Sequence, residues 1–380
     1  MVNKADFLLE QSAIVSYCET LRLPVEITEA IGEASSSIRR DARLLEAIAN
    51  CCRLLFQADG GWKGREAAIR QYNELLRSSE EKLAAMLAPV IMISGLPYTT
   101  ELYRSRGIPD AVLLETLGDL QLRMQLYRDK HGRWGTDSFA WLCHQFTGGM
   151  FRLGRLQFHL VQFPYPMHVF RRAGTREVAI FPESGISFRA DGCINGTNGI
   201  DAPTWTSRLE ITGRYFAGNR IDSDGFGHPD TTLLAAEEWE HVLKPKDTII
   251  KIHIPQDGKM SRAACRQSYA RAVPFFEKHF PETPFAAMYC ATWLLSPQWQ
   301  QLLPAESNIA QFRHDYHPFP LEGDDGQMFE RVFGAKPADL AIAPRDTLLR
   351  RVVLDRLSAG GVIHSGAGII LKEEANGYFE

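Results

Sequence analysis

The sequence predicts an α+β protein in which a helical N-terminal domain precedes a second domain built around a mixed sheet. Three observations support this prediction. Apolar residues recur at helical spacing through the first 150 of the 380 residues, strand-like alternation begins near residue 150, and the length suits two domains of ordinary size. We therefore expect a helical domain at residues 1–150 and an α+β domain at residues 151–380.

Helical signals are clear in the first domain. Pro109 suits the first turn of a helix, and Gly132 suits its end. Between them, one buried helix face is indicated by five apolar residues at steps of four, three, four and three positions: Leu113, Leu117, Leu120, Met124 and Tyr127. Residues 43–56 and 62–87 are expected to form two further helices.

Extended segments prevail in the second domain. Residues 154–163 alternate apolar and polar side chains, as a half-buried strand does. Further strands are expected at residues 168–172, 177–181, 186–189 and 208–216, and a turn-rich loop at residues 191–203. Helices are expected to return at residues 231–243, 261–280 and 297–303.

The composition excludes several classes of protein. Lys and Arg number 42 and Asp and Glu number 46, and the formal net charge of -4 does not suit a polybasic nucleic-acid binder. The longest apolar run, residues 83–93, is shorter than the roughly 20 residues of a membrane span, and no signal peptide is evident. The seven cysteines show no C-x-x-C spacing, which favours reduced thiols. We expect a cytoplasmic protein with no membrane or nucleic-acid partner.

Residues 247–319 contain the pattern on which the functional prediction depends. A strand at residues 247–254 is followed by a short loop and by a helix that begins after Ser261, a residue suited to an N-cap. A strand at 285–293, a short helix and an extended segment at 308–319 come next. The N–H groups and the positive dipole end of the first helix form an anion site. Gly258 permits close backbone approach there, and Lys259 adds positive charge.

This order of elements is similar to the cofactor half of GNAT N-acyltransferases, in which the loop and the helix N-terminus hold the pyrophosphate of acyl-coenzyme A (acyl-CoA). Along nearly its whole length the chain also resembles a bacterial family assigned as acyltransferases, with an N-terminal helical domain and a GNAT-like C-terminal domain. The resemblance rests on residues 94–109 (SGLPYTTELYRSRGIP), 131–142 (HGRWGTDSFAWL), 151–158 (FRLGRLQF), 242–255 (VLKPKDTIIKIHIP), 275–282 (FFEKHFPE), 290–298 (CATWLLSPQ), 302–309 (LLPAESNI), 345–353 (RDTLLRRVV) and 360–368 (GGVIHSGAG).

The resemblance implies an acyl-CoA-dependent N-acyltransferase with a GNAT-like mixed sheet and a small-molecule amine as acceptor. The strand end at Ile254 would part from its neighbour and offer a backbone N–H to the thioester oxygen. Ile254, Gly258, Lys259 and Ser261 are the expected cofactor-binding residues.

Four further residues are candidates for catalysis, and each has a structural alternative. His253 would act as the general base for the amine, or it is a strand histidine bonded to backbone. Glu210 would be a carboxylate base on a central strand, or a solvated surface residue. Ser307 and Asn308 would lie near the acyl carbonyl or the thiolate, or would cap a helix.

Two other functions stay open. The GNAT loop has a second small residue after its glycine, whereas residues 256–261 (QDGKMS) contain one glycine, so the alternative is a catalytically inactive GNAT-derived module that binds a ligand or a protein. The hypothesis of a thiol enzyme that uses Cys290 with His253 is weaker, because a mid-strand cysteine is usually a buried small hydrophobe.

No metal is expected, because His314 and His317 lack further ligands. The helical domain would form the acceptor wall or a homodimer surface.

Overall fold

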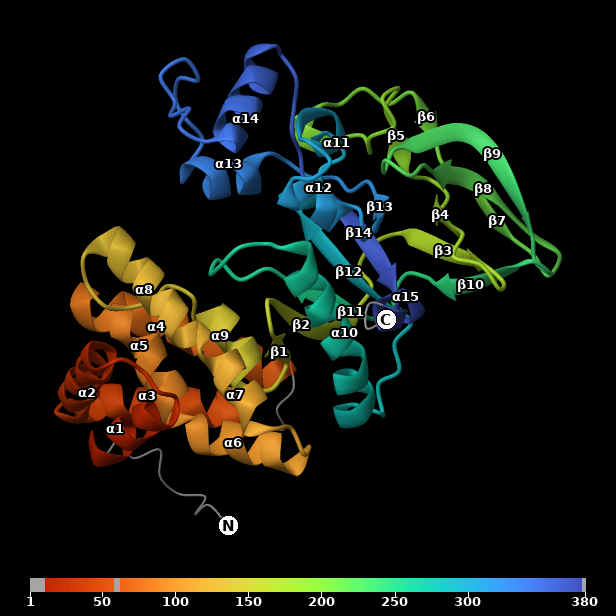
Figure 1. The fold of residues 1–380 in the computed structure, drawn as a ribbon. Coiled ribbons are helices and arrows are strands. Elements are labelled where there is room, and N and C mark those ends of the chain that lie inside the picture. Colours follow the sequence, from red (N-terminus) through yellow and green to blue (C-terminus); the bar gives the residue numbers. More distant parts are fainter. Residues whose placement is uncertain (1–10, 58–61, 378–380) are drawn as a thin grey trace. The chain divides into compact units, whose positions relative to one another are not determined.

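The computed structural model describes residues 11–57 and 62–377. The chain divides into two compact units, Met1–His159 and Leu160–Glu380 (Figure 1). The first unit is helical, with α1 (Gln11–Thr20), α2 (Val25–Arg39), α3 (Ala42–Phe56), α4 (Trp62–Ser78), α5 (Glu81–Ser94), α6 (Leu96–Ser105), α7 (Asp110–Leu117), α8 (Asp119–His131) and α9 (Phe139–Phe146).

The helix expected between Pro109 and Gly132 is two helices. Gly118 ends α7, where its N–H donates to the Leu114 carbonyl oxygen at 3.0 Å, and α8 begins at the next residue. Gly132 ends α8 in the left-handed conformation, with φ of 70°, as expected of a glycine after a helix. The expected apolar face is buried at Leu113, Leu117, Leu120 and Met124.

The helix expected at residues 62–87 is also divided, into α4 and α5. Within α5 the residues from Ala85 to Ser94 are buried. By length and composition alone, the helical segment Glu81–Ser105 could cross a membrane, but 72% of its most apolar stretch is buried inside the protein. The core helix of a protein without a membrane span can have the same length and apolar composition, so this segment gives little support for a membrane span.

A hairpin of β1 (Met150–Leu153) and β2 (Leu156–Gln162) lies where the units divide. Strand β1 packs against α7 and α9, which is why the first unit extends to His159. The second unit continues with β3 (Met167–Arg172), β4 (Val178–Pro182), β5 (Ser187–Phe188), β6 (Trp205–Thr206), β7 (Leu209–Ile211), β8 (Tyr215–Ile221), β9 (Gly227–Ala235), β10 (Trp239–Leu243) and β11 (Thr248–His253).

The remaining elements alternate strands and helices. They are α10 (Arg262–His279), β12 (Ala287–Thr292), η2 (Trp293–Leu295), α11 (Trp299–Leu302), α12 (Asn308–Arg313), β13 (His317–Phe319), α13 (Gly326–Phe333), α14 (Leu348–Ser358), β14 (Gly366–Leu371) and α15 (Lys372–Asn376). Strands β11, β12, β14 and β13 are neighbours in that order in one sheet, in which β11 and β12 are parallel. A second sheet has the order β10-β3-β4-β8-β7, and β9 pairs with β8.

Three expectations for the second unit are wrong. Residues 208–216 do not form one strand, because β7 ends at Ile211 and the chain turns back into β8, which pairs antiparallel with it. Residues 231–243 form β9 and β10 and not a helix, because pairing of Leu234 with Phe216 and of Trp239 with Arg172 supplies backbone hydrogen bonds and buries both apolar side chains. The segment 308–319 is not extended throughout. Its first part is α12, whose N-cap Ser307 accepts a hydrogen bond from the Ala310 N–H, and only β13 is a strand.

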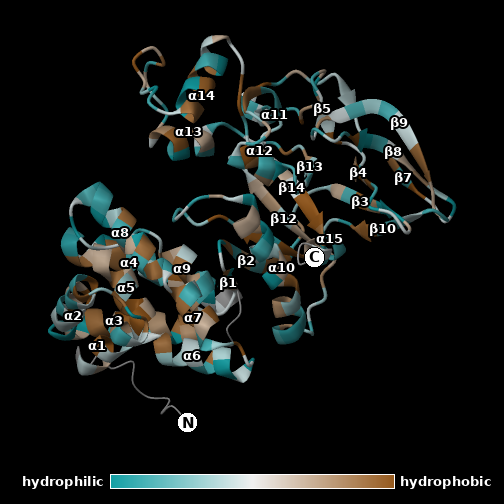
Figure 2. Ribbon diagram, viewed as in Figure 1, coloured by the Kyte–Doolittle hydropathy of each residue, from teal (hydrophilic) through white to brown (hydrophobic). Residues whose placement is uncertain are grey.

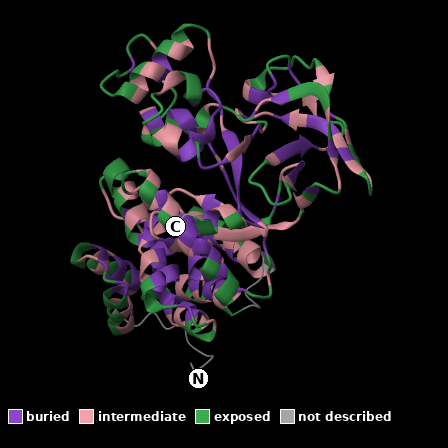
Figure 3. Ribbon diagram, turned by 45° about the vertical axis from the view of Figure 1, so that its right-hand side comes forward, coloured by how far each residue is buried: buried purple, intermediate pink, exposed green. Residues whose placement is uncertain are grey.

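The main core of the second unit joins the two sheets. Met167 and Ile180 of the second sheet pack with Ile249, Tyr289 and Ile369 of the first. The strand β14 is among the most hydrophobic in Figure 2, and both β14 and the neighbouring β12 are largely buried. By contrast β9 is largely exposed, as the green strand in Figure 3 shows. The sheet that contains β11 and β12 therefore packs into this core and positions the residues at the ends of its strands.

Candidate functional site

The expected anion site forms at the N-terminus of α10. Ser261 is the N-cap, and its hydroxyl accepts a hydrogen bond from the Ala264 N–H at 3.3 Å, so the helix begins where the sequence places it. A pocket of about 860 Å³ is lined by the first turns of this helix, including Ser261, Arg262, Arg266 and Gln267. A helix N-terminus attracts anions through its N–H groups and its dipole, and here two guanidinium groups stand beside it.

Both guanidinium groups bind one buried carboxylate. Arg262 Nη2 lies 2.8 Å and Arg266 Nη2 2.7 Å from Asp315 Oδ1, and the Asp315 side chain is fully buried. The two arginine side chains are 31% and 37% exposed. One carboxylate offsets one of the two positive charges, so the group keeps a net positive charge beside the pocket. Sequence reasoning missed these arginines, although their positions one and five residues after Ser261 placed them on the first turns of the expected helix.

The loop between β11 and α10 contains the other expected cofactor residues. Gly258 is exposed and has φ of +87°, a backbone conformation that favours glycine, although a Cβ there would meet nothing within 4 Å. Lys259 is exposed and Ile254 is half-buried. The structure thus places Ile254, Gly258, Lys259 and Ser261 along one short connection; their role in binding stays a prediction.

Strands β11 and β12 pair over only part of their length. The recorded pairs between these described strands are Ile250 with Met288 and Lys251 with Tyr289, although β11 runs on to His253 and β12 to Thr292. Strand β12 stays paired with β14 as far as Thr292 opposite Gly366. The recorded pairing between β11 and β12 thus stops before His253, as the expected parting of the two strands requires.

The other candidates for catalysis lie on other elements than His253. Glu210 is exposed on β7 in the second sheet, where the Tyr215 hydroxyl donates to its Oε1 at 2.9 Å, and Figure 1 shows β7 well away from α10. Ser307 caps α12, as its structural alternative expects, and Asn308 is the first residue of that helix. A catalytic role for either residue stays a prediction. His253 is half-buried at the end of β11, beside the loop to α10.

Cys290 has the properties of a core residue. Its side chain is 1% exposed, and burial raises the pKa of its thiol to about 12. A thiol with this pKa is protonated at neutral pH and is a poor nucleophile. Within the described residues no group of three or more His, Cys, Asp or Glu side chains could hold a metal ion.

Two family models match the chain. The model of the GNAT-like C-terminal domain matches residues 150–370, and the model of the N-acyltransferase N-terminal domain matches residues 13–148. The chain belongs to the GNAT-like C-terminal domain family. The expected pairing of a helical N-terminal domain with a GNAT-like α+β domain is confirmed.

Solved acyltransferase structures share this fold. An acyltransferase in complex with decanoyl-CoA and teicoplanin is 20% identical, with a TM-score of 0.62 over 94% of this chain and 86% of that chain. A mutant acyltransferase in complex with octanoyl-CoA is 21% identical, with a TM-score of 0.61 over the same 94% and 86%. At these identities the similarity shows the fold alone. A comparison with curated proteins gave no match.

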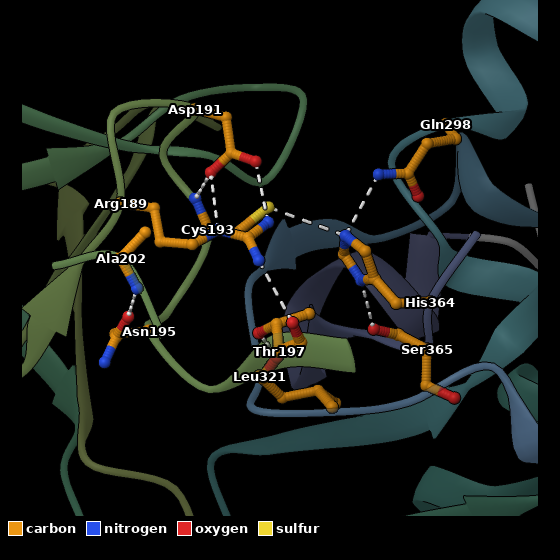
Figure 4. A network of polar contacts seen from close by, with 10 residues as sticks. All are labelled: Arg189, Asp191, Cys193, Asn195, Thr197, Ala202, Gln298, Leu321, His364 and Ser365. Atoms are coloured by element: carbon orange, nitrogen blue, oxygen red, sulfur yellow. Dashed lines mark hydrogen bonds and ion pairs between the residues drawn. The ribbon is translucent and has the colours of Figure 1, made fainter. Parts of the chain in front are cut away.

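A second polar cluster of the GNAT-like domain joins segments that are far apart in the sequence (Figure 4). Cys193 Sγ, in the loop after β5, lies 3.5 Å from His364 Nε2, and Gln298 Nε2 lies 3.0 Å from the same nitrogen. Arg189 forms an ion pair with Asp191 at 2.7 Å beside them. The cluster therefore ties the β5–β6 loop to the segments that follow β12 and precede β14.

The contacts of His364 fix its tautomer. Its Nδ1 lies 2.9 Å from the Ser365 carbonyl oxygen, which can only accept, so Nδ1 carries the proton and Nε2 accepts from Gln298 and Cys193. Burial raises the pKa of the Cys193 thiol to about 11 and lowers that of the His364 imidazole. Both groups are neutral at pH 7, so this pair connects segments of the fold and is not an activated nucleophile.

Acidification is expected to weaken this connection. The lowered pKa of His364 means that the folded state binds its proton less readily than the unfolded state, whose pKa is near 6.5. The contribution of His364 is complete above pH 6.5 and is lost as pH falls toward the folded pKa, by up to about 1.4 kcal/mol per pH unit. Urea unfolding at pH 7.5, 6.5 and 5.5 should show a shallower pH dependence for His364→Gln than for the wild type. Identical slopes would contradict the prediction.

Proposed function

We propose that this protein transfers an acyl group from acyl-CoA to the amine of a small-molecule acceptor. The observation that carries the proposal is the pocket at the N-terminus of α10, where Arg262 and Arg266 leave a net positive charge around Asp315. A net charge of -4 repels a phosphate-rich cofactor from the protein as a whole, so its pyrophosphate needs local cations and backbone donors. The Ser261-capped helix with its two arginines supplies both.

The proposed reaction uses the end of β11. The acceptor nitrogen would attack the thioester carbonyl carbon while His253 takes the amine proton, directly or through a water molecule. A backbone N–H at Ile254 would stabilise the negative charge that develops on the carbonyl oxygen. Collapse of the tetrahedral intermediate would break the C–S bond, and the leaving coenzyme A thiolate would take the proton held by His253, which returns the imidazole to its neutral form. The recorded pairing of β11 with β12 ends at Lys251, and this supports the proposed placement of the thioester.

Calorimetry with coenzyme A, octanoyl-CoA and decanoyl-CoA tests the proposal. The acyl forms are chosen because the acyltransferases of similar fold bind them. We expect binding that weakens about 10- to 100-fold in Arg262→Gln, because a hydrogen bond to a charged group contributes about 1.5–3 kcal/mol. Arg266 still pairs with Asp315 in this variant, so no buried carboxylate is left alone.

A matched control is Arg214→Gln, an exposed arginine on the turn between β7 and β8, which should leave affinity unchanged. The absence of binding by the wild type at millimolar ligand would overturn the proposal. Binding without transfer to any amine in a broad screen would favour the inactive binding module, which the single-glycine loop at residues 256–261 also suggests.

A further inference from the structure

A second pocket lies next to the one at the N-terminus of α10. Its volume is about 320 Å³, and its lining includes Arg176, Arg266, His314, Asp315, His317 and Glu374. Arg266 belongs to the linings of both pockets, and it binds Asp315 at 2.7 Å. The two pockets therefore meet at one guanidinium–carboxylate contact on the flank of α10.

Both carboxylates of the second pocket already have partners. Asp315 binds Arg262 and Arg266. Glu374 Oε1 lies 2.7 Å from His317 Nε2, and its Oε2 accepts the Leu371 N–H at 2.8 Å. Hydrogen bonds and ion pairs of this kind hold a carboxylate in place and reduce its repulsion of a second anion.

The charge around the pocket favours an anion. The lining itself has two arginines, Arg176 and Arg266, against the carboxylates of Asp315 and Glu374. Arg262, which lines the neighbouring pocket and also binds Asp315, brings the local charge to one positive before the histidines are counted. Arg176 and His314 are exposed. His314 Nδ1 lies 3.2 Å from Arg262 Nη2, which can only donate, so Nε2 is the ring nitrogen that can donate to a ligand. This local excess of positive charge contrasts with the formal net charge of -4 of the whole chain.

We propose that this second pocket binds the 3′-phosphate of coenzyme A, an inference that rests on the proposed function. Coenzyme A carries its pyrophosphate and a phosphate monoester on the same ribose. With the pyrophosphate at the N-terminus of α10, the monoester enters the neighbouring pocket across Arg266. The monoester is a dianion near neutral pH, and guanidinium and imidazole N–H groups are suitable donors to its oxygens. Arg176 and His314 are then the residues that distinguish coenzyme A from its 3′-dephospho form.

Competition between coenzyme A and 3′-dephospho-coenzyme A tests this assignment. At low ionic strength the wild type should bind coenzyme A at least about tenfold more tightly than the dephospho form, the effect of one good charge-assisted contact. The double variant Arg176→Gln/His314→Gln should lose most of that preference and keep its affinity for the dephospho form. Both residues are exposed, so the variant should fold normally, which its circular dichroism spectrum and melting temperature check. Arg214→Gln should behave as the wild type.

The outcomes separate this inference from the proposed function. Equal affinity of the wild type for the two ligands would overturn the phosphate subsite and leave the acyl-CoA proposal intact. A preference that persists in the double variant would place the subsite elsewhere and overturn the role of this pocket. Failure of both ligands to bind would overturn the proposed function and the subsite together.

Discussion

Replacing His253 by glutamine is expected to lower kcat for acyl transfer about 100- to 10,000-fold, the usual contribution of a general base. His253 is the last residue of β11, where the recorded pairing with β12 has already ended, and it adjoins the loop that leads to α10. Glutamine keeps hydrogen-bonding groups of similar size but cannot take a proton from an amine at neutral pH. The measurement is the initial rate of coenzyme A release with an acceptor identified by screening amines.

Two controls test whether a loss of rate in His253→Gln comes from the missing base: the affinity for coenzyme A and the rate of a second variant, Cys290→Ala. Coenzyme A should bind the His253→Gln variant as it binds the wild type, because the pocket residues Arg262 and Arg266 are unchanged. Cys290→Ala should retain the rate, because the buried Cys290 thiol is protonated and lies within the core. An unchanged kcat in His253→Gln would remove its assignment as base, and a large loss of rate in a folded Cys290→Ala variant would revive the thiol mechanism.

Gly366→Ala is expected to have the largest effect on stability. Gly366 begins β14 opposite Thr292 of β12, and a Cβ there would lie 2.2 Å from the Leu295 carbonyl oxygen and 2.8 Å from its carbonyl carbon. These are backbone atoms of η2, so relief of the overlap requires movement of the chain and not rotation of a side chain. We expect a loss of about 3 kcal/mol, at the upper end of the usual cost of overpacking.

Thermal and urea unfolding measure this loss, and Gly213→Ala is the matched control. A Cβ at Gly213, between β7 and β8, would meet nothing within 4 Å, and its φ is not positive. Its substitution should change the free energy of unfolding by less than about 0.5 kcal/mol. If the two alanine variants unfold alike, the contact between the start of β14 and η2 is not the constraint that we infer.

Much of the element order on which the site depends was predictable from sequence. The strand before Pro255, the cap at Ser261 and the parallel partner β12 lie close to their expected positions. Each depends on local signals: an isoleucine-rich run, a side chain that accepts a helix N–H, and a second apolar run after the helix. The errors fell where pairing outweighed local preference, as in β9 and β10, or where one cap started a short helix, as at Ser307.

Only part of the candidate site could be predicted from the sequence. The loop from Ile254 to Ser261 could be named because its residues are consecutive. The arginines of α10 could not be given a role, because their partner Asp315 lies 53 and 49 residues farther along the chain. Glu210 has the sequence context of a catalytic carboxylate on a strand, but its strand, β7, belongs to the second sheet and not to the one that contains β11 and β12.

The two-part organisation, the helical first unit and the capped helix after β11 could be read from the sequence, because they depend on periodicity and on contacts within a few residues. Which charges and polar groups meet depends on the fold. Arg262, Arg266 and Asp315 converge beside two pockets, and Cys193 reaches His364 across 171 residues. Hydrogen bonds and ion pairs act over a few ångströms in space, so their partners become identifiable only when the fold has set the distances.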